Sequence, residues 1–152
     1  MNEYEEIRRA IDIYLMERFK YRLSLVYLTP DNIVTTRRVS QIDLYLRIRR
    51  VASLFPPDCL IIARLSFSKE RVGHGSHFVR FLAETALKHG FRHIGIESVK
   101  EKSRAFAEKL GFYSIDGFNY AVSIENLIFY FWGITNIYYK CYSKVIFLQK
   151  YT

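Results

Sequence analysis

The segment from Leu60 to Phe112 constrains the fold of this chain more than any other part of its sequence. Residues 60–67 form an apolar run that is typical of a strand, and a short polar connection leads from it into a loop with two glycines at residues 71–76. Apolar side chains at three- and four-residue spacing then predict an amphipathic helix: Phe78, Val79, Leu82, Ala83 and Ala86. Because glycines allow a tight turn and a helix start has unpaired N–H groups, this order predicts an anion-binding loop.

The loop does not carry the motif of a nucleotide-binding protein. No third glycine follows Gly73 and Gly75 at the spacing of a dinucleotide fingerprint, and the Gly-Lys-Ser/Thr ending of a nucleoside-triphosphate loop is missing. Ser76 is expected to cap the following helix, and His74 is interpreted as a solvated loop residue or a phosphate donor. Both of these nucleotide classes are therefore excluded, and the anion remains to be identified.

A second sequence pattern lies about thirty residues after the glycine loop, at residues 103–112. After the predicted strand at residues 93–98, residues 103–112 read Ser-Arg-Ala-Phe-Ala-Glu-Lys-Leu-Gly-Phe. Together with the glycine loop, this segment resembles the central half of a GNAT-type N-acetyltransferase, with Phe106, Lys109, Gly111 and Phe112 in register with the family pattern. The resemblance covers roughly residues 59–122. Taken alone, the second segment also reads as a helix end, with Gly111 as a left-handed cap.

The resemblance implies a fold and a cofactor. The fold would be a single α/β domain over residues 1–152, in which helices flank a mixed, mostly antiparallel sheet. The cofactor would be acetyl-CoA, the acyl donor. Its pyrophosphate would be held by Arg71, Val72, Gly73, His74, Gly75 and Ser76. Its pantetheine and thioester would lie along Leu65, Ser66 and Phe67, and Phe106 and Lys109 would flank it.

Three positions depart from the family pattern. Glu70 stands where a glutamine or arginine is expected, and Lys100 stands where an asparagine is often found. Ala107 stands where a tyrosine commonly protonates the leaving thiolate. The candidate general base is Glu97, at the end of the second core strand, with an outward-facing strand residue as the alternative interpretation. The proton donor is left open among Ser98, Tyr113, Tyr120 and Cys141.

The resemblance implies transfer of an acetyl group from acetyl-CoA to a primary amine. The acceptor is open: a small molecule, a protein or, as in the toxin members of the family, an aminoacyl-tRNA. A second hypothesis is a module that has lost catalysis and binds CoA, protein or nucleic acid without turnover. Glu70 and Ala107 favour that second hypothesis. A third is a nucleic-acid-binding protein that does not use CoA.

Charge and composition limit the partners of the chain. The net charge is +8, from 23 Lys and Arg against 15 Asp and Glu, and arginines cluster at positions 37–38, 47–50 and 64. Such a field attracts CoA or an RNA such as tRNA, although it also suits an ordinary soluble surface. The histidines show no metal-ligand spacing with the cysteines. Two cysteines without a disulfide framework or a leader predict a cytoplasmic protein, and no apolar run is long enough to span a membrane.

Outside the central segment, periodicity predicts most of the remaining elements. Residues 3–19 are expected to form an amphipathic helix, and residues 22–36 a hairpin with Pro30 in its turn. Residues 40–55 are ambiguous: alternation favours a strand, as the resemblance does, whereas Ser40 with Asp43 resembles a capping box and favours a helix, which we prefer on local signals. Strands are expected at 120–124 and 144–149.

The aromatic stretch between Leu127 and Tyr142 has three open interpretations. It is expected to line an acceptor pocket, to mediate self-association into a homodimer, or to fill the core.

Overall fold

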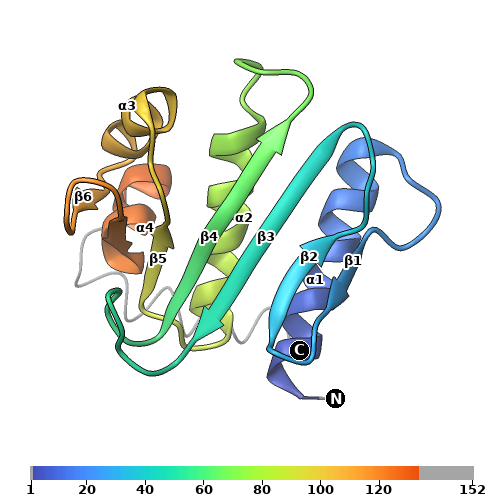
Figure 1. Cartoon of the computed structure of the whole chain (residues 1–152), viewed down its shortest axis with the longest axis horizontal. Coiled ribbons are helices and arrows are strands. Elements are labelled where there is room, and N and C mark those ends of the chain that lie inside the picture. Colours follow the sequence, from blue (N-terminus) through green and yellow to red (C-terminus); the bar gives the residue numbers. More distant parts are fainter. Residues whose placement is uncertain (1, 134–152) are drawn as a thin grey trace.

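A seven-stranded sheet organises residues 2–133, the part of the chain that the computed structural model describes. The strands stand in the order β1-β2-β3-β4-β5-β7-β6 (Figure 1). Neighbouring strands are antiparallel, except that β4 and β5 are parallel. The strands are β1 (Val26–Leu28), β2 (Ile33–Thr36), β3 (Ile42–Arg49), β4 (Cys59–Phe67), β5 (His93–Ile96), β6 (Tyr113–Ser114) and β7 (Tyr120–Ser123). The helices are α1 (Glu3–Phe19), α2 (His74–Lys88), α3 (Glu101–Lys109) and α4 (Ile124–Trp132). The expected mixed, mostly antiparallel sheet with flanking helices is confirmed.

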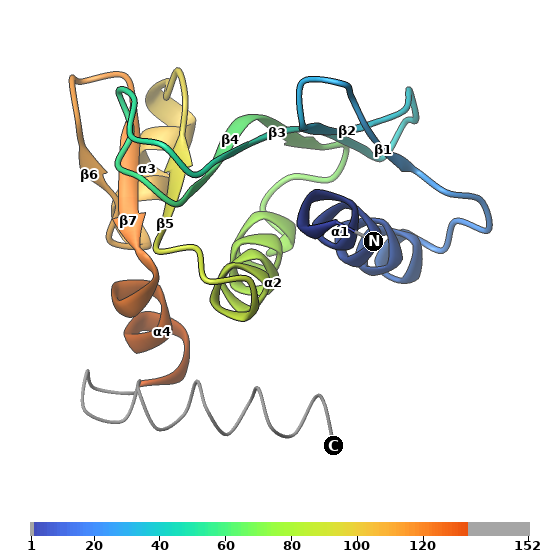
Figure 2. The same cartoon turned by 90° about the horizontal axis from the view of Figure 1, so that it is seen from below.

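Two helices cover one face of the sheet. Figure 2 shows α1 and α2 side by side beneath the strands. The apolar stripe of α1, with Ile7, Ile11 and Leu15 fully buried, faces the sheet, as its helical spacing predicts. The stripe of α2 is buried in the same layer, and α4 packs against α2. The expected helix at residues 3–19 is therefore confirmed.

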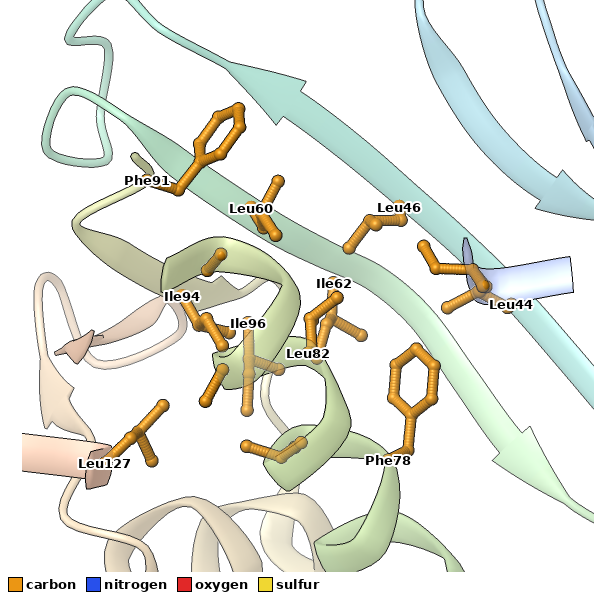
Figure 3. Packing of buried hydrophobic residues seen from close by; sticks show 14 of the residues in the cluster. Leu44, Leu46, Leu60, Ile62, Phe78, Leu82, Phe91, Ile94, Ile96 and Leu127 are labelled. Carbon is orange, nitrogen blue, oxygen red and sulfur yellow. The ribbon is translucent and has the colours of Figure 1, made fainter. Parts of the chain in front are cut away.

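The core lies between this sheet face and the helices. Alternate residues of the central strands point into it, because successive side chains of a strand point to opposite faces. Figure 3 shows the cluster, which includes Leu44, Leu46, Leu60, Ile62, Phe78, Leu82, Phe91, Ile94, Ile96 and Leu127. A smaller cluster of Phe55, Cys59, Ile61 and Ala121 lies on the other face. Burial raises the pKa of the Cys59 thiol to about 12, so this thiol is protonated at neutral pH.

The helix that we preferred for residues 40–55 is wrong. Residues Ile42–Arg49 form β3, whose buried side chains alternate with partly exposed ones. The supposed capping box does not form, because the Asp43 carboxylate pairs with Arg64 of β4 at 2.7 Å. Pairing of β3 with β4 over its whole length, and with β2 at residues 45–47, outweighs the local helix signals.

The hairpin is confirmed, with a shorter first strand. β1 pairs with β2, and Asn32 adopts a left-handed conformation in the turn between them. The chain before β1 is held instead by a buried carboxylate of α1. Asp12 accepts hydrogen bonds from the backbone N–H groups of Leu25 and Val26 at 2.7 and 3.0 Å, and from the Ser24 hydroxyl at 2.7 Å. This contact fixes the position of the β1–β2 hairpin on α1.

The strand expected at residues 120–124 is confirmed as β7, which ends where Ser123 caps α4. Within α4, Leu127 and Ile128 are buried in the core, whereas Phe129 and Tyr130 are exposed. The strand expected at 144–149, Cys141 and the aromatic residues beyond Gly133 lie outside the described residues. None of the helices in residues 2–133 has the length and apolar character that a membrane crossing requires.

Replacing Asp12 with alanine should destabilise the fold. The change leaves two buried backbone N–H groups without an acceptor, and we expect the free energy of unfolding to fall by about 3 kcal/mol. Urea denaturation followed by circular dichroism measures this loss. The matched control is Asp31→Ala in the exposed hairpin turn, which should change stability by less than about 0.5 kcal/mol. Equal effects of the two substitutions would contradict the anchoring role of Asp12.

Candidate functional site

The sheet opens between its two parallel strands. Residues Cys59 to Ile62 of β4 pair with His93 to Ile96 of β5, and the backbone N–H of Glu97 makes one further bond to the Ile62 carbonyl at 2.9 Å. Beyond this point β4 continues to Phe67, still paired with β3, while β5 has ended. The last five residues of β4 therefore have a strand on one side only, within the described chain.

A β-bulge lies where the two strands separate. In the β3–β4 register, Tyr45 faces Arg64 and Leu46 faces Ile62, so Ala63 is an extra residue on β4. A bulge bends the strand that carries it and increases its local twist. Its position directly after Ile62 turns the end of β4 away from β5. Leu65, Ser66 and Phe67 are thus placed on the open side of the split.

The glycine loop that follows β4 turns the chain into α2. Gly73 is the N-cap residue, with a φ of 86°, a conformation that glycine adopts without the steric cost of a Cβ atom. The expected cap at Ser76 is wrong, because α2 begins at His74 and Ser76 lies inside its first turn. The first turn contains no acidic residue, in contrast to those of α1, α3 and α4.

The backbone N–H groups of residues 71–76 have no hydrogen-bond acceptor among residues 2–133. The first helical bond of α2 runs from the N–H of His77 to the carbonyl of Gly73 at 3.0 Å. Those of Gly73 to Ser76 are the four unpaired donors that every helix start presents, and those of Arg71 and Val72 lie in the loop before it. The segment that was predicted to bind an anion therefore has its main-chain donors free.

The loop packs closely against α3. A Cβ atom built on Gly75 would lie 3.2 Å from Cε2 of Phe106, closer than most real side-chain contacts. Only glycine fits at this position without displacing the ring. The contact brings together two segments that the sequence patterns singled out separately, the glycine loop and residues 103–112.

A cleft of about 710 Å³ lies between the end of β4, the glycine loop and α3. We call it the loop cleft. Of the residues predicted to hold the cofactor, all except the exposed Val72 line it: Leu65, Ser66, Phe67, Arg71, Gly73, His74, Gly75, Ser76, Phe106 and Lys109. Sequence reasoning missed Lys69, Glu70, Lys102, Ser103 and Ala105, which also line it.

The lining of the loop cleft is cationic. Four lysine and arginine side chains line it against one acidic side chain, Glu70, which pairs with Lys102 at 3.6 Å. Both partners of that pair are largely exposed, so it contributes little to stability. The positive pole of α2 points at the same space. The cleft thus favours an anionic ligand through side chains, main-chain donors and the helix dipole together.

His74 is held in place by α1, contrary to the expectation of a solvated loop residue. Its ring lies 5.0 Å from Phe19 and 5.3 Å from Phe67, and Nδ1 accepts a hydrogen bond from Arg18 Nε at 3.0 Å. Because an arginine only donates, His74 carries its proton on Nε2. Desolvation, with smaller contributions from Arg18, Lys69 and His77, lowers the pKa of His74.

Glu97 lies at the point where β4 and β5 separate, and an arginine holds its carboxylate. Arg47 Nε donates to Glu97 Oε1 at 2.9 Å, across the sheet from β3. Glu97 is not among the described residues that line the loop cleft. Its role as a base stays a prediction, and its carboxylate is oriented by Arg47.

The position at which the resemblance implies a tyrosine is closed to the cleft. Ala107 is fully buried in the core, so it supplies no acid. Of the predicted proton donors, Tyr120 is buried and Tyr113 is exposed on β6, and neither lines the cleft. Ser98 also lies outside the lining, whereas Ser66 and Ser103 place hydroxyl-bearing side chains within it.

The charge of Arg18 should contribute, after desolvation, to the lowered pKa of His74. In the folded chain the pKa of His74 lies below the ordinary 6.5, so the unfolded state binds more protons and acidification below 6.5 destabilises the fold through this group. Arg18→Gln keeps an N–H donor for Nδ1 and removes the charge, and it should raise the pKa of His74. Histidine NMR titration measures the change. The control is His89, remote from Arg18, whose titration should not move.

Comparison with solved structures finds distant likeness. A point mutant of the AtaT toxin, bound to the C-terminus of the antitoxin AtaR and acetyl-CoA, is 15% identical, has a TM-score of 0.49, and aligns over 66% of this chain and 71% of its own. The same toxin with AtaR alone is 16% identical, with a TM-score of 0.48 and coverage of 67% and 70%.

A cAMP-binding acyltransferase from Mycobacterium smegmatis is 11% identical and has a TM-score of 0.45. The alignment covers 73% of this chain but only 35% of that longer protein. No protein-family model matches the chain, and no curated protein matches its sequence. The mixed, mostly antiparallel sheet and the order of strand, glycine loop and helix agree with what the sequence resemblance implied. The fold described over residues 2–133 is therefore the GNAT-like architecture that the sequence resemblance implied.

Proposed function

We propose that the loop cleft binds acetyl-CoA or a related acyl-CoA, and that the chain transfers the acyl group to a primary amine. The observation that carries the proposal is the row of unpaired main-chain N–H groups at residues 71–76 beside a cationic cleft. A diphosphate is the group that such donors, a helix start and flanking cations bind best. CoA carries a diphosphate at the end of a long, flexible arm.

The open edge of β4 gives that arm a place to lie. Residues 63–67 have β3 on one side and no strand on the other, in the described chain. The two amides of pantetheine can add to this edge as a short strand would, through main-chain hydrogen bonds. The diphosphate at residues 71–76 and the arm along residues 63–67 together require the elongated cleft that these two segments line.

Acyl-CoA would supply a thioester carbonyl beside the split. An N–H group of residues 65–67 is suited to polarise that carbonyl, since the edge of β4 is free there. The amine nitrogen bonds to the carbonyl carbon, the carbon–sulfur bond breaks, and the proton lost by the amine ends on the thiolate sulfur. Glu97, held by Arg47 at the point of the split, is our candidate to receive that proton first.

A second candidate function is a module that binds CoA without turnover. Ala107 is buried, and the Glu97 carboxylate already has an arginine partner, so two groups expected to move protons are absent or engaged. Titration with acetyl-CoA, followed by release of free thiol with a panel of amines, distinguishes the two functions. Binding with turnover supports the transferase, and binding without turnover on any amine supports the module.

Ser76→Asp should weaken CoA binding while stabilising the fold. A carboxylate in the first turn of α2 repels the diphosphate, and we expect at least a tenfold loss of affinity, or about 1.4 kcal/mol. The same charge interacts favourably with the helix dipole and should add about 0.5 kcal/mol to the unfolding free energy. Calorimetry with CoA and urea denaturation measure the two effects. The isosteric control, Ser76→Asn, should retain binding; equal loss in both variants would argue against a diphosphate at this turn.

Glu97→Gln should lower kcat without weakening CoA binding. A positioned general base contributes roughly a hundredfold or more to a rate, and glutamine keeps the size and an acceptor for Arg47 while it removes the base. Thiol release over a range of pH measures kcat, and calorimetry measures affinity. The matched variant is Arg47→Gln, which should lower kcat less because the carboxylate remains. An unchanged rate in Glu97→Gln would assign the carboxylate a structural role.

A further inference from the structure

A second cleft, of about 750 Å³, lies beside the β2–β3 connection and the end of β4. We call it the arginine cleft, and three guanidinium groups line it, those of Arg37, Arg38 and Arg64. The proposed cofactor does not account for it, because none of these arginines lines the loop cleft. The arginine clusters that the sequence showed at 37–38 and 64 therefore converge on one concave surface.

These arginines are not balanced by acids around the cleft. Arg37 Nε donates to the Ser24 carbonyl at 2.8 Å, which fixes the side chain but leaves its charge uncompensated. Arg38 is exposed and forms no hydrogen bond or ion pair with residues 2–133. Arg64 pairs with Asp43, the one acidic side chain in the lining, at 2.7 Å. Three cations against one anion leave a net positive cleft that an anionic ligand would neutralise.

Guanidinium groups select for a particular kind of anion. Their planar pairs of N–H donors match the two oxygens of a carboxylate or a phosphate. A volume near 750 Å³ falls in the range of small-molecule sites rather than extended grooves. The cleft is therefore suited to a small molecule with a phosphate or carboxylate group.

The arginine cleft adjoins the loop cleft across one pair of strands. Asp43 of the arginine cleft is the cross-strand partner of Ser66, which lines the loop cleft. Directly opposed side chains lie about 5 Å apart and on the same side of a sheet. Because Leu44 is buried toward the helices, Asp43 and Ser66 lie on the opposite face, which α1 and α2 leave uncovered.

We propose that the arginine cleft binds the acceptor, and that the acceptor is a small amine with a phosphate or carboxylate group. The acceptor role rests on the proposed transferase function. Arg38 and Arg64 hold the acidic group, and the amine reaches across Asp43 and Ser66 toward the thioester. The nitrogen replaces sulfur at the carbonyl carbon, the thiolate leaves, and the proton lost by the amine goes to the sulfur, so the reaction balances with acyl-CoA alone.

The first test is binding without CoA. O-phosphoethanolamine and glutamate, the probes for the two acidic groups, should bind the full chain in calorimetry, and ethanolamine should bind far more weakly. Arg38→Gln and Arg64→Gln should each lower the affinity for the more tightly bound of these two probes by about tenfold, which is the effect of losing one charged hydrogen bond. The matched control is Arg49→Gln, an exposed arginine of β3 outside both clefts. No binding of either probe, or equal losses in the Arg38 and Arg49 variants, overturns the proposal.

Two further measurements separate this inference from the proposed function. Ser76→Asp weakens CoA in the loop cleft and should leave probe affinity unchanged; a loss would place the probe in the loop cleft and overturn the proposal. In thiol-release assays with acetyl-CoA, Arg38→Gln should raise KM for the acidic amine and leave that for ethanolamine unchanged. CoA binding with no preference for acidic amines overturns the acceptor role alone. If a probe binds but CoA does not, the transferase function and the acceptor role are both overturned. The arginine cleft is then supported only as an anion-binding site.

Discussion

The separation of β4 from β5 after Ile62 is the constraint on which the rest of the site depends. Two features produce it: β5 ends at Ile96, and the extra residue Ala63 bends β4 at the same level. A sheet that remained paired would leave no free edge and no space between its strands. The split therefore converts the middle of a packed sheet into an open site, while β3 keeps the bent end of β4 in place.

The arrangement of charges at the site slightly lowers the stability of the fold. α2 begins with a glycine in a left-handed conformation and no acid in its first turn, so its own chain does little to satisfy the helix start. Lysines and arginines gather at the same end, although like charges repel. Stability comes from elsewhere, in particular from the apolar stripes of α1 and α2 against the sheet. A bound anion therefore stabilises this helix start more than it would one whose N–H groups already face an acidic side chain of the same chain.

Periodicity predicted α1, α2, β4 and β7, because burial of one face follows directly from the spacing of apolar residues. It failed at β3, where Ser40 and Asp43 resemble a helix start but Asp43 instead finds Arg64 on the neighbouring strand. The contacts of His74 with Phe19 and Arg18 join residues far apart in the chain, and so does the pair of Arg47 and Glu97. Local patterns carry no information about such partners, whereas the contact of Gly75 with Phe106 joined two motifs that the resemblance had already placed together.

The two clefts share a border because they lie on either side of one strand. Side chains of β4 alternate between the faces of the sheet, so Leu65 packs toward the helices while Arg64 and Ser66 face the side that α1 and α2 leave open. A transfer reaction needs its two substrates to meet at one point from different directions. A single bent strand with a donor along its free edge and an acceptor over its open face meets that requirement without moving the backbone. The bulge at Ala63 then serves both substrates, because it sets the direction of the edge and of the side chains that follow it.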